Sequence, residues 1–431
     1  MSEVEINSKQ MKSEENIQTE IKDDEKLKEE EKIRNEEKLE PTDYYSVFVG
    51  ALTSLLFGIN LTSYATLSEI FKEGKINKAA NLSFAMSERT WPISQSILNI
   101  GAIFGNIFIG FIILNDKFIL ILNDFFFLIG YMLLLYGNKS ITVILARFII
   151  GIGIGIVSSI TPIYLSKLAN KKNKGIISTC HQLFIMFGVL CGNIISYFCS
   201  TAERWKISIF IQIGIVILHF LAAFFTKKVT ISESNEIVSI RTLFTDKNAR
   251  RSVIIAFALH IGQQMTCING IIFESDRILE KTGNPKAYSM VIGVAAILGV
   301  FVTMSVIDKF GRKILLLFST TLVSLFLFLI GANLFKTMSL FGFIIAFSVG
   351  MGPIPWFITN EIFKSNYVGT INMVSIPTNW FTSYLITQTI ELMLKKFGDK
   401  VFWVFSGITM VLTIFILLFF RETKGKNPGF Q

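Results

Sequence analysis

The sequence predicts an all-α membrane protein with twelve transmembrane helices in two six-helix halves. Three observations predict this class. Of the 431 residues, 51% are hydrophobic and only 17% are charged, whereas soluble domains average about 25% charged residues. After Asp43 the chain is a succession of apolar runs, each near the ~20 residues that a bilayer-spanning helix needs. The longest internal polar segment, 226–251, falls after the sixth run and divides the chain into six plus six.

Helices are the expected form of these runs, because a lone strand leaves its backbone groups unsatisfied in lipid. The runs also hold glycines inside and charges at their ends. The expected spans are 44–66, 93–114, 118–136, 140–163, 176–199, 206–225, 252–273, 287–307, 314–335, 339–360, 370–394 and 400–420. We expect an N-terminal bundle over 44–225, a linker over 226–251, a C-terminal bundle over 252–420 and a short tail over 421–431.

Residues 1–43 differ in character from the rest of the chain. They hold eight Lys or Arg against fifteen Asp or Glu and have no early apolar core of the kind a signal peptide needs. Such a segment has little apolar surface to bury, so we expect a disordered acidic tail. Basic residues gather in 167–174 and in 226–251, which predicts that these loops and both termini are cytosolic.

The net charge of +9 is therefore a topology signal, and no basic and aromatic patch suggests nucleic acid. Cysteines and histidines occur singly inside expected spans, without a CxxC or a Cys/His cluster, so we expect packed side chains rather than metal ligands or disulfides. No nucleophile–base pair or phosphate-binding loop is present, which argues against an enzyme and against a cofactor. The residues concerned are Cys180, Cys191, Cys199, Cys267, His181, His219 and His260.

The segment IGQQMTCINGIIF, 261–273, places three amides in an apolar run. An amide without partners in an apolar medium costs roughly 2–7 kcal/mol. For one amide alone, a hydrogen bond to a neighbouring helix is the simpler explanation. Gln263, Gln264 and Asn269 do not share one face of an ideal helix. An unwound segment near Cys267 would let all three converge on a cavity.

Two further spans contain prolines at positions that interrupt a helix. Pro353 and Pro355 stand in GPIPWF, and Pro377 stands beside Asn379 and Trp380. A break at membrane depth is tolerated where the freed backbone faces protein or a cavity. We therefore expect both the tenth and the eleventh spans to be broken helices that line a cavity.

Most polar side chains inside the spans are neutral amides, which both donate and accept hydrogen bonds. A ligand covered in hydroxyl groups needs partners of this kind, and aromatic faces suit the C–H faces of a sugar ring. A charged ligand would call for buried opposite charge, of which little is present. The set is Asn60, Arg147, Gln182, Gln263, Gln264, Asn269 and Asn379, with Trp356 and Trp380 nearby.

Together these stretches resemble the sugar porters, the hexose-transporter branch of the major facilitator superfamily. The matching motifs cover nearly the whole chain after the tail. They are SLLFGIN (54–60), ARFIIGIGIG (146–155), TPIYLSKLA (161–169), HQLFIMFGVL (181–190), GQQMTCIN (262–269), DKFGRK (308–313), GPIPWFITNEIF (352–363), TNW (378–380) and ETKG (422–425).

The resemblance implies the major facilitator fold and transport of a hexose-like sugar by alternating access. It implies a monomeric protein of the lipid bilayer, in the plasma membrane. Proton-coupled members carry Asp where Asn60 stands, so facilitated diffusion is favoured. Alternatives are a proton symporter of a sugar or polyol that uses Asp124, or a sensor that binds sugar without transporting it. The implied sugar contacts are Gln182, Gln263, Gln264, Asn269, Trp356, Asn379, Trp380 and Asn60.

The resemblance also implies a gating latch of ion pairs, to which we assign Arg147, Lys167, Asp308, Arg312 and Glu361. Lys167 stands where the family has Glu, and we expect it to pair with Asp308 or Glu361. Other departures affect the substrate: Ala296 replaces an Asn, Ser348 replaces a Glu, and Phe273 and Glu274 replace two gate tyrosines. A pentose or another small hydroxylated metabolite is therefore an alternative substrate.

Overall fold

The computed structural model describes residues 42–72, 75–80, 82–87, 89–110, 116–170, 172–229, 238–273 and 285–431. Residues 43–431 form one compact unit. The acidic tail over 1–41 and Glu274 lie outside the described residues, so our expectations for them stay predictions. Two short helices, α3 (Ser68–Phe71) and α4 (Lys75–Ala79), follow the first long helix, and α10 (Ile240–Thr245) lies between the two halves in sequence.

The described residues fold into helices whose bounds lie within a few residues of most expected spans. Those of the first half are α2 (Tyr44–Thr66), α5 (Thr90–Gly110), α6 (Asp116–Tyr136), α7 (Ser140–Leu168), α8 (Lys174–Cys199) and α9 (Trp205–Ala223). Those of the second half are α11 (Arg250–Met265), α12 (Ile268–Phe273), α14 (Pro285–Phe310), α15 (Arg312–Gly331), α16 (Lys336–Val349), α17 (Ile354–Phe357), α18 (Thr359–Ile362), α19 (Ser365–Phe397) and α20 (Val401–Phe419).

Eleven segments of the described chain are long and apolar enough to cross a membrane. The longest of them, Ser365–Phe419, holds α19 and α20 with the turn Gly398–Lys400 between them, so it contains two spans. The expected fold class of twelve helices in two halves is confirmed. The chain is a multi-pass integral membrane protein.

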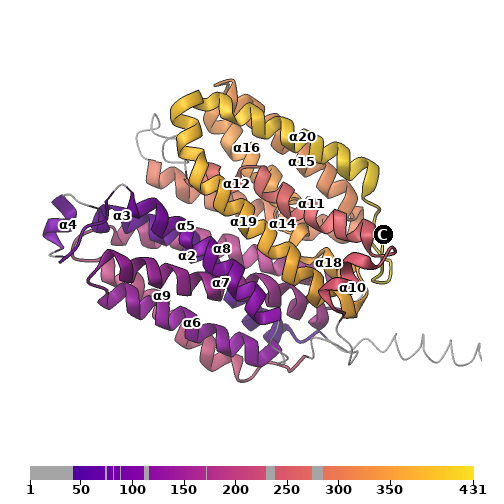
Figure 1. The fold of residues 1–431 in the computed structure, drawn as a ribbon, viewed down its shortest axis with the longest axis horizontal. Coiled ribbons are helices and arrows are strands. Elements are labelled where there is room, and N and C mark those ends of the chain that lie inside the picture. Colours follow the sequence, from indigo (N-terminus) through magenta and orange to yellow (C-terminus); the bar gives the residue numbers. More distant parts are fainter. Residues whose placement is uncertain are drawn as a thin grey trace, which may run out of the picture. The chain divides into compact units, whose positions relative to one another are not determined.

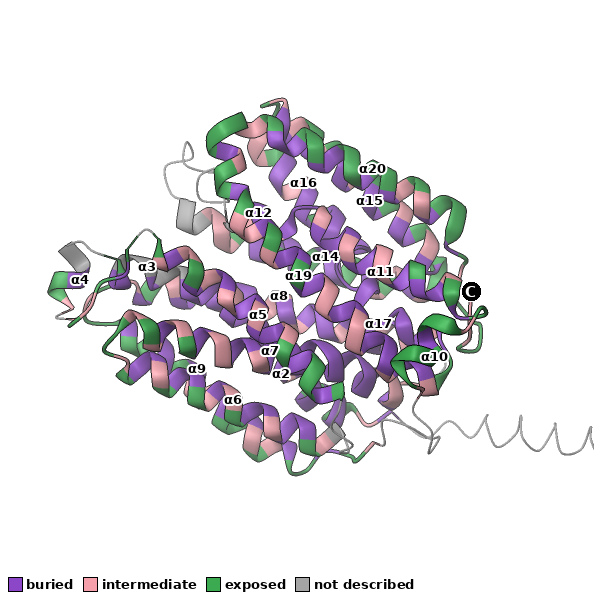
Figure 2. Ribbon diagram, in the orientation of Figure 1, coloured by how far each residue is buried: buried purple, intermediate pink, exposed green. Residues whose placement is uncertain are grey.

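The two halves meet along two pairs of helices. In Figure 1 the first half, indigo to magenta, lies below the second half, orange to yellow. Helix α5 packs against α19, and α8 packs against α14. Figure 2 shows exposed residues along the outer helices, such as α9 and α20, and buried residues toward the middle. Many exposed side chains are large and apolar, including Leu218, Val411 and Leu418, as expected where helices face acyl chains.

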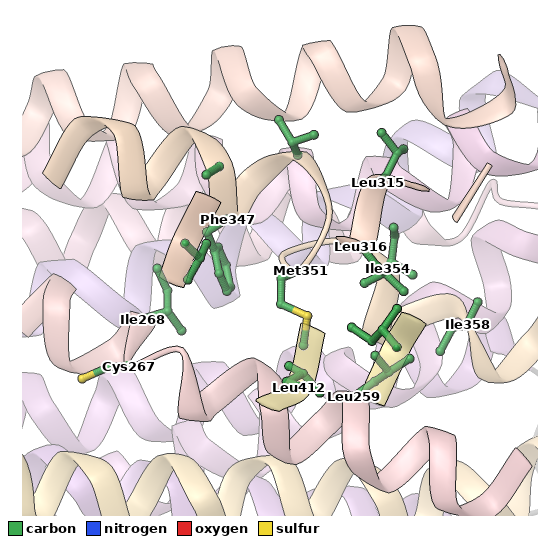
Figure 3. Packing of buried hydrophobic residues seen from close by; sticks show 14 of the residues in the cluster. Leu259, Cys267, Ile268, Leu315, Leu316, Phe347, Met351, Ile354, Ile358 and Leu412 are labelled. Atoms are coloured by element: carbon green, nitrogen blue, oxygen red, sulfur yellow. The ribbon is translucent and has the colours of Figure 1, made fainter. Parts of the chain in front are cut away.

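Two helices are broken where the sequence predicts. Helix α11 ends at Met265, Cys267 takes a left-handed conformation with φ of 63°, and α12 begins at Ile268. The tenth span is interrupted over 350–353, between α16 and α17. Figure 3 shows Met351, inside this second break, among Leu259 of α11, Leu412 of α20 and Ile354 of α17.

The expected break at Pro377 is wrong, because α19 is one continuous helix from Ser365 to Phe397. The interrupted tenth span combines Gly350 and Gly352 with two prolines, whereas Pro377 has no glycine beside it. Thr378 also donates a hydrogen bond to the Val374 carbonyl, one turn back. A single proline of this kind removes one backbone bond without ending a helix that its neighbours hold.

Glycines permit close backbone contact between helices of the first half. A Cβ atom on Gly58 of α2 would lie 2.0 Å from the Ile185 carbonyl oxygen, and one on Gly188 of α8 would lie 2.1 Å from the Leu55 carbonyl oxygen. Helices α5 and α7 approach each other in the same way. In lipid such packing replaces the hydrophobic drive that holds helices together in water.

We predict that Gly58→Ala lowers the stability of the purified protein by about 1–3 kcal/mol, because the new methyl group meets backbone atoms that cannot move aside. Thermal unfolding in detergent measures the effect. Gly214→Ala in α9 is the control, because a Cβ atom there meets nothing within 4 Å. Equal melting temperatures for the two variants would show that the α2–α8 contact is not close.

Candidate functional site

The break between α11 and α12 brings the three amides of the GQQ–Asn segment together, as the sequence predicts. The Asn269 amide donates to the Gln264 side-chain oxygen at 2.8 Å and to Ser383 Oγ of α19 at 2.7 Å. Gln264 in turn donates to the side-chain oxygen of Asn379 at 2.9 Å. The left-handed turn at Cys267 makes this possible, because a regular helix would point Asn269 away from Gln264.

The amide chain continues from α19 to the break in the tenth span. Asn379 donates to the Gln263 side-chain oxygen at 2.8 Å and to the His260 backbone oxygen at 2.9 Å. Gln263 then donates to the Met351 and Gly352 carbonyl oxygens, both at 2.9 Å. These are carbonyls that the interrupted helix leaves without a helical partner, so Gln263 satisfies the backbone of the break. The four amides therefore join α11, α12, the broken span and α19.

One expected contact faces this chain from the other half. Gln182 of α8 is buried, and its side chain makes no hydrogen bond with another described residue. Its amide nitrogen lies near Gly352, where an added Cβ atom would be 3.4 Å away. Neither polar atom of this side chain is among the fully buried unpaired atoms of the described residues, so Gln182 keeps its full hydrogen-bonding capacity for another molecule.

Aromatic side chains from both halves surround the same place. Trp356 of α17 lies 6.4 Å, between ring centroids, from Phe57 of α2 and 6.3 Å from Trp380 of α19. Trp380 donates from its indole nitrogen to Ser158 Oγ of α7 at 3.2 Å. Trp356, Ile376 and Trp380 thus belong to the apolar core of the first half although they come from the second.

Asn60 and Arg147 lie deeper in the first half than the amide chain. Asn60 donates to the Leu56 carbonyl oxygen and to the Tyr131 hydroxyl. The Arg147 guanidinium lies 4.0 Å from the centre of the Tyr64 ring and reaches the Asn60 and Ser94 carbonyl oxygens at 3.4 Å. Among the described residues these contacts, a cation–π contact and two carbonyl hydrogen bonds, take the place of a carboxylate partner for Arg147, and its role in gating stays a prediction.

Two histidines stand beside Trp356, and sequence reasoning passed over both as packed helix residues. The His181 ring of α8 lies 5.7 Å from the Trp356 ring and the His260 ring of α11 lies 5.9 Å from it, both edge-on. His181 Nδ1 hydrogen-bonds Ser54 Oγ at 2.7 Å. His181 Nε2 and both nitrogens of His260 are buried without a hydrogen-bond partner among the described residues. Each such nitrogen costs about 1–3 kcal/mol. The available signal was spacing, since His260, Gln263 and Gln264 share a helical face.

The third histidine has a different environment. His219 Nδ1 of α9 lies 2.8 Å from an Asp124 carboxylate oxygen of α6, and both residues are fully buried. The pair lies inside the first half, and among the described residues neither side chain hydrogen-bonds to the amide chain. Asp124, the acid that the proton-symport alternative would use, is therefore paired with His219 in this structure.

Ala296 of α14 and Ser348 of α16, the two positions expected to differ from the sugar porters, lie on helices that pack against each other. Both are buried. A Cβ atom on Gly299 of α14 would lie 2.8 Å from the Ser348 Cβ atom. The Ser348 hydroxyl is buried without a hydrogen-bond partner among the described residues.

A cluster of charges closes one end of the bundle, which we call the latch end. Arg312 is only 4% exposed, and its guanidinium contacts Glu361 at 2.8 Å and Asp308 at 3.1 Å. Asp308 also accepts a hydrogen bond at 3.2 Å from the backbone nitrogen of Ile176, in the first turn of α8. A carboxylate is stabilised at a helix N-terminus. The expected trio of Asp308, Arg312 and Glu361 is thus brought together, and Asp308 links it to the other half.

Gly175 allows this link, because a Cβ atom there would lie 2.2 Å from an Asp308 carboxylate oxygen. Lys174, next to it, is electrostatically attracted to Glu361. Lys167 lies in the last turn of α7, and its pairing with a latch carboxylate stays a prediction.

The segment after α20 packs onto the latch through Glu422. Its carboxylate accepts four backbone N–H groups, those of Arg312, Lys313, Thr423 and Lys424, at 2.8–2.9 Å. Burial raises the pKa of the Glu422 carboxyl, but the four donors together outweigh it and hold the pKa below the ordinary value of 4.5. Gly311, with φ of 87°, makes the turn that aims the start of α15 at this carboxylate.

The two halves are also bridged at the opposite end of the bundle. Asn193 of α8 donates to the Ser289 carbonyl oxygen of α14 at 2.9 Å. Gln388 of α19 donates to Ser96 Oγ of α5. Since Asp308 and Ile176 bridge the halves at the latch end, contacts between the halves occur on both sides of the amide chain.

Comparison with known proteins agrees with this architecture. A family model described as "Sugar (and other) transporter" matches residues 46–229 and 226–427. Facilitated glucose transporter member 2 of solute carrier family 2 from Sus scrofa is 28% identical over 397 residues, which cover 78% of this chain and 75% of that protein. The sugar transporter ERD6-like 7 from Arabidopsis thaliana is 26% identical over 440 residues, covering 89% and 92%.

Solved structures share the fold at lower sequence identity. The proton:xylose symporter XylE bound to 6-bromo-6-deoxy-D-glucose has a TM-score of 0.75 and 18% identity, covering 89% of this chain and 97% of that one. The inward-open xylose transporter XylE from E. coli has a TM-score of 0.68 and 20% identity, covering 88% and 97%.

The helices, the two halves and the polar interface between them define a transporter with the major facilitator fold. The chain belongs to the sugar transporter family of the major facilitator superfamily. It is a transporter and not an enzyme, and sugar transport is the function that this membership supports.

We predict that Asp308→Asn favours the conformation open at the latch end, because it weakens both the bond to Ile176 N and the pair with Arg312. Labelling of a cysteine introduced among the interface residues near Asp308, with a thiol reagent added from the latch side, should become several times faster. Glu391→Gln is the control, because Glu391 forms an exposed pair with Lys395. Unchanged labelling in Asp308→Asn would show that this bridge does not hold the latch end closed.

We predict that the contact of Glu422 with α15 weakens in acid. A carboxyl whose pKa is lower in the folded protein adds stability above its ordinary pKa, and loses it as pH falls through the lowered value. Thermal stability should therefore fall as the pH drops below about 4.5, and Glu422→Gln should flatten that part of the profile. Identical acid profiles for the two proteins would mean that the four donors do not depend on the charge.

Proposed function

We propose that this protein transports a hexose-like sugar across the membrane by alternating access between its two halves. The observation on which the proposal rests is the chain of four amides, Gln263, Gln264, Asn269 and Asn379, placed opposite Gln182 at the interface of the halves. Hydroxyl groups donate and accept as amides do. A sugar can therefore exchange its water for these side chains and favour closure by bridging the halves.

Within this proposal each residue has a distinct task. Gln182 and Asn269 offer hydrogen-bonding capacity that the protein leaves unused. Gln263 and Asn379 hold the broken helix in place, and Trp356 supplies an apolar face for the ring of the sugar. Asp308, Arg312 and Glu361 close the latch end and release it when the halves rock.

Facilitated diffusion is the favoured mode, and Asn60 supports it. An amide cannot take up and release a proton, and Asn60 is already bonded to Tyr131 and to its own helix. A proton-coupled mode is the second candidate, supported by the buried Asp124–His219 pair, because an ionisable pair in a membrane span is a plausible proton relay. One of the solved structures that share this fold is that of a proton:xylose symporter.

The remaining parts of the proposal concern placement. Both termini and the linker over 226–251 lie in the cytosol, which puts the latch on the cytosolic side. We propose the plasma membrane as the location and the monomer as the working unit. This orientation is inferred from the basic residues of 167–174 and 226–251, because loops rich in Lys and Arg lie on the cytosolic side.

Uptake into proteoliposomes tests the function. Radiolabelled hexoses, pentoses and polyols are offered one at a time, with and without an imposed proton gradient. The expected result is saturable uptake of at least one hexose or pentose that stops at equal concentrations inside and outside, with or without the gradient. Accumulation driven by the gradient would replace facilitated diffusion by symport. Uptake no faster than in empty liposomes for every compound would contradict the proposal.

We predict that Gln182→Ala raises the half-saturating sugar concentration about tenfold. A tenfold change corresponds to ~1.4 kcal/mol, which is the contribution of one hydrogen bond to binding. The fold should be unaffected, because the protein offers Gln182 no hydrogen bond to lose. Gln212→Ala is the matched control, a buried glutamine within the first half. A half-saturating concentration that stays at the wild-type value in Gln182→Ala would exclude Gln182 from the site.

A further inference from the structure

The two histidines beside Trp356 are unexplained by the mechanism above. His181 comes from the first half and His260 from the second, and their rings meet the same tryptophan edge-on at 5.7 and 5.9 Å. Both are buried, and three of their four ring nitrogens have no hydrogen-bond partner among the described residues. Buried polar atoms in folded proteins are almost always paired, so three orphaned nitrogens at one place require a reason.

Packing alone does not explain them. A phenylalanine would offer Trp356 a similar edge without burying polar atoms. His219, the remaining histidine of the chain, has its Nδ1 paired with Asp124 and its Nε2 buried without a partner among the described residues, so His260 is the histidine that has neither nitrogen paired. The rings of His181 and His260 instead lie among groups that the proposed substrate would contact.

The neighbours of both histidines are the proposed sugar contacts. His260 lies one turn before Gln263 on α11, and its backbone oxygen accepts the Asn379 amide at 2.9 Å. His181 directly precedes Gln182 on α8. A neutral imidazole has one donor and one acceptor nitrogen, which is the pairing that a hydroxyl group can complete.

We propose that His260, together with His181, binds hydroxyl groups of the substrate and determines which sugars the protein accepts. This inference rests on the proposed transport function and adds two residues to its site. The sugar then bridges α8 and α11 through the histidines, in addition to the amides. Sugars that lack a hydroxyl at the position facing His260 are poor substrates.

The test combines His260 variants with a panel of monodeoxy sugars in proteoliposome uptake. His260→Phe keeps a ring against Trp356 and removes both nitrogens, whereas His260→Gln restores a donor and an acceptor. Phe257→Leu, one turn earlier on α11, and Cys180→Ser, beside His181 on α8, are the controls. Thermal unfolding is measured for each protein, so that a loss of folding is not taken for a loss of binding.

Four results are expected. His260→Phe raises the half-saturating concentration of the preferred sugar about tenfold while the maximal rate changes less. Its melting temperature does not fall, because the substitution removes orphaned polar atoms. For the wild type, one monodeoxy sugar has a half-saturating concentration about tenfold higher than that of the parent sugar. For His260→Phe, the half-saturating concentrations of these two sugars are equal. His260→Gln recovers part of the discrimination.

Three outcomes would overturn the inference. A half-saturating concentration and a deoxy-sugar profile in His260→Phe equal to those of the wild type would exclude a contact with substrate. A clear fall in melting temperature with unchanged discrimination would assign His260 a packing role. If the wild type transports no sugar of the panel, the proposed function fails and the inference fails with it. If the wild type transports sugar and the His260 variants behave like it, only the inference fails.

Discussion

The site depends on one constraint: in a membrane interior, a carboxamide without hydrogen-bond partners costs free energy. For Gln263, Gln264, Asn269 and Asn379 the chain supplies partners by breaking two helices and joining the breaks through side chains. Asn269 reaches Gln264 because Cys267 turns the backbone, and Gln263 satisfies the carbonyl groups of Met351 and Gly352. The polar centre and the irregular backbone are therefore a single feature, since each supplies the partners that the other lacks.

The polar centre also lies beside the contact between the two halves. Trp356 and Trp380 leave the second half and pack in the core of the first, so the amide chain lies directly behind the interface. The latch at one end and the contacts of Asn193 and Gln388 at the other lie on either side of it. A guest that offers hydroxyl groups can replace some amide–amide bonds at little cost, because one set of hydrogen bonds is exchanged for another.

Much of the fold could be predicted from the sequence, because lipid permits few alternatives to a helix of about 20 apolar residues. The unwound turn at Cys267 was predictable as well, since no regular helix lets Gln264 and Asn269 meet. The sequence could not show that α19 continues through Pro377, which depends on tertiary support. Nor could it show that Arg147 lies over the Tyr64 ring or that His260 lies beside Trp356, because both depend on which helices face each other.

A structure determined with bound sugar tests the account most directly. Glucose, or the sugar that uptake assays favour, should lie against Trp356, within hydrogen-bond distance of Gln182 and Asn269, with at least one bond of the amide chain replaced by a bond to a hydroxyl group. Sugar bound elsewhere, with Gln263, Gln264, Asn269 and Asn379 still bonded to one another as they are here, would contradict the view that these amides exist to receive it.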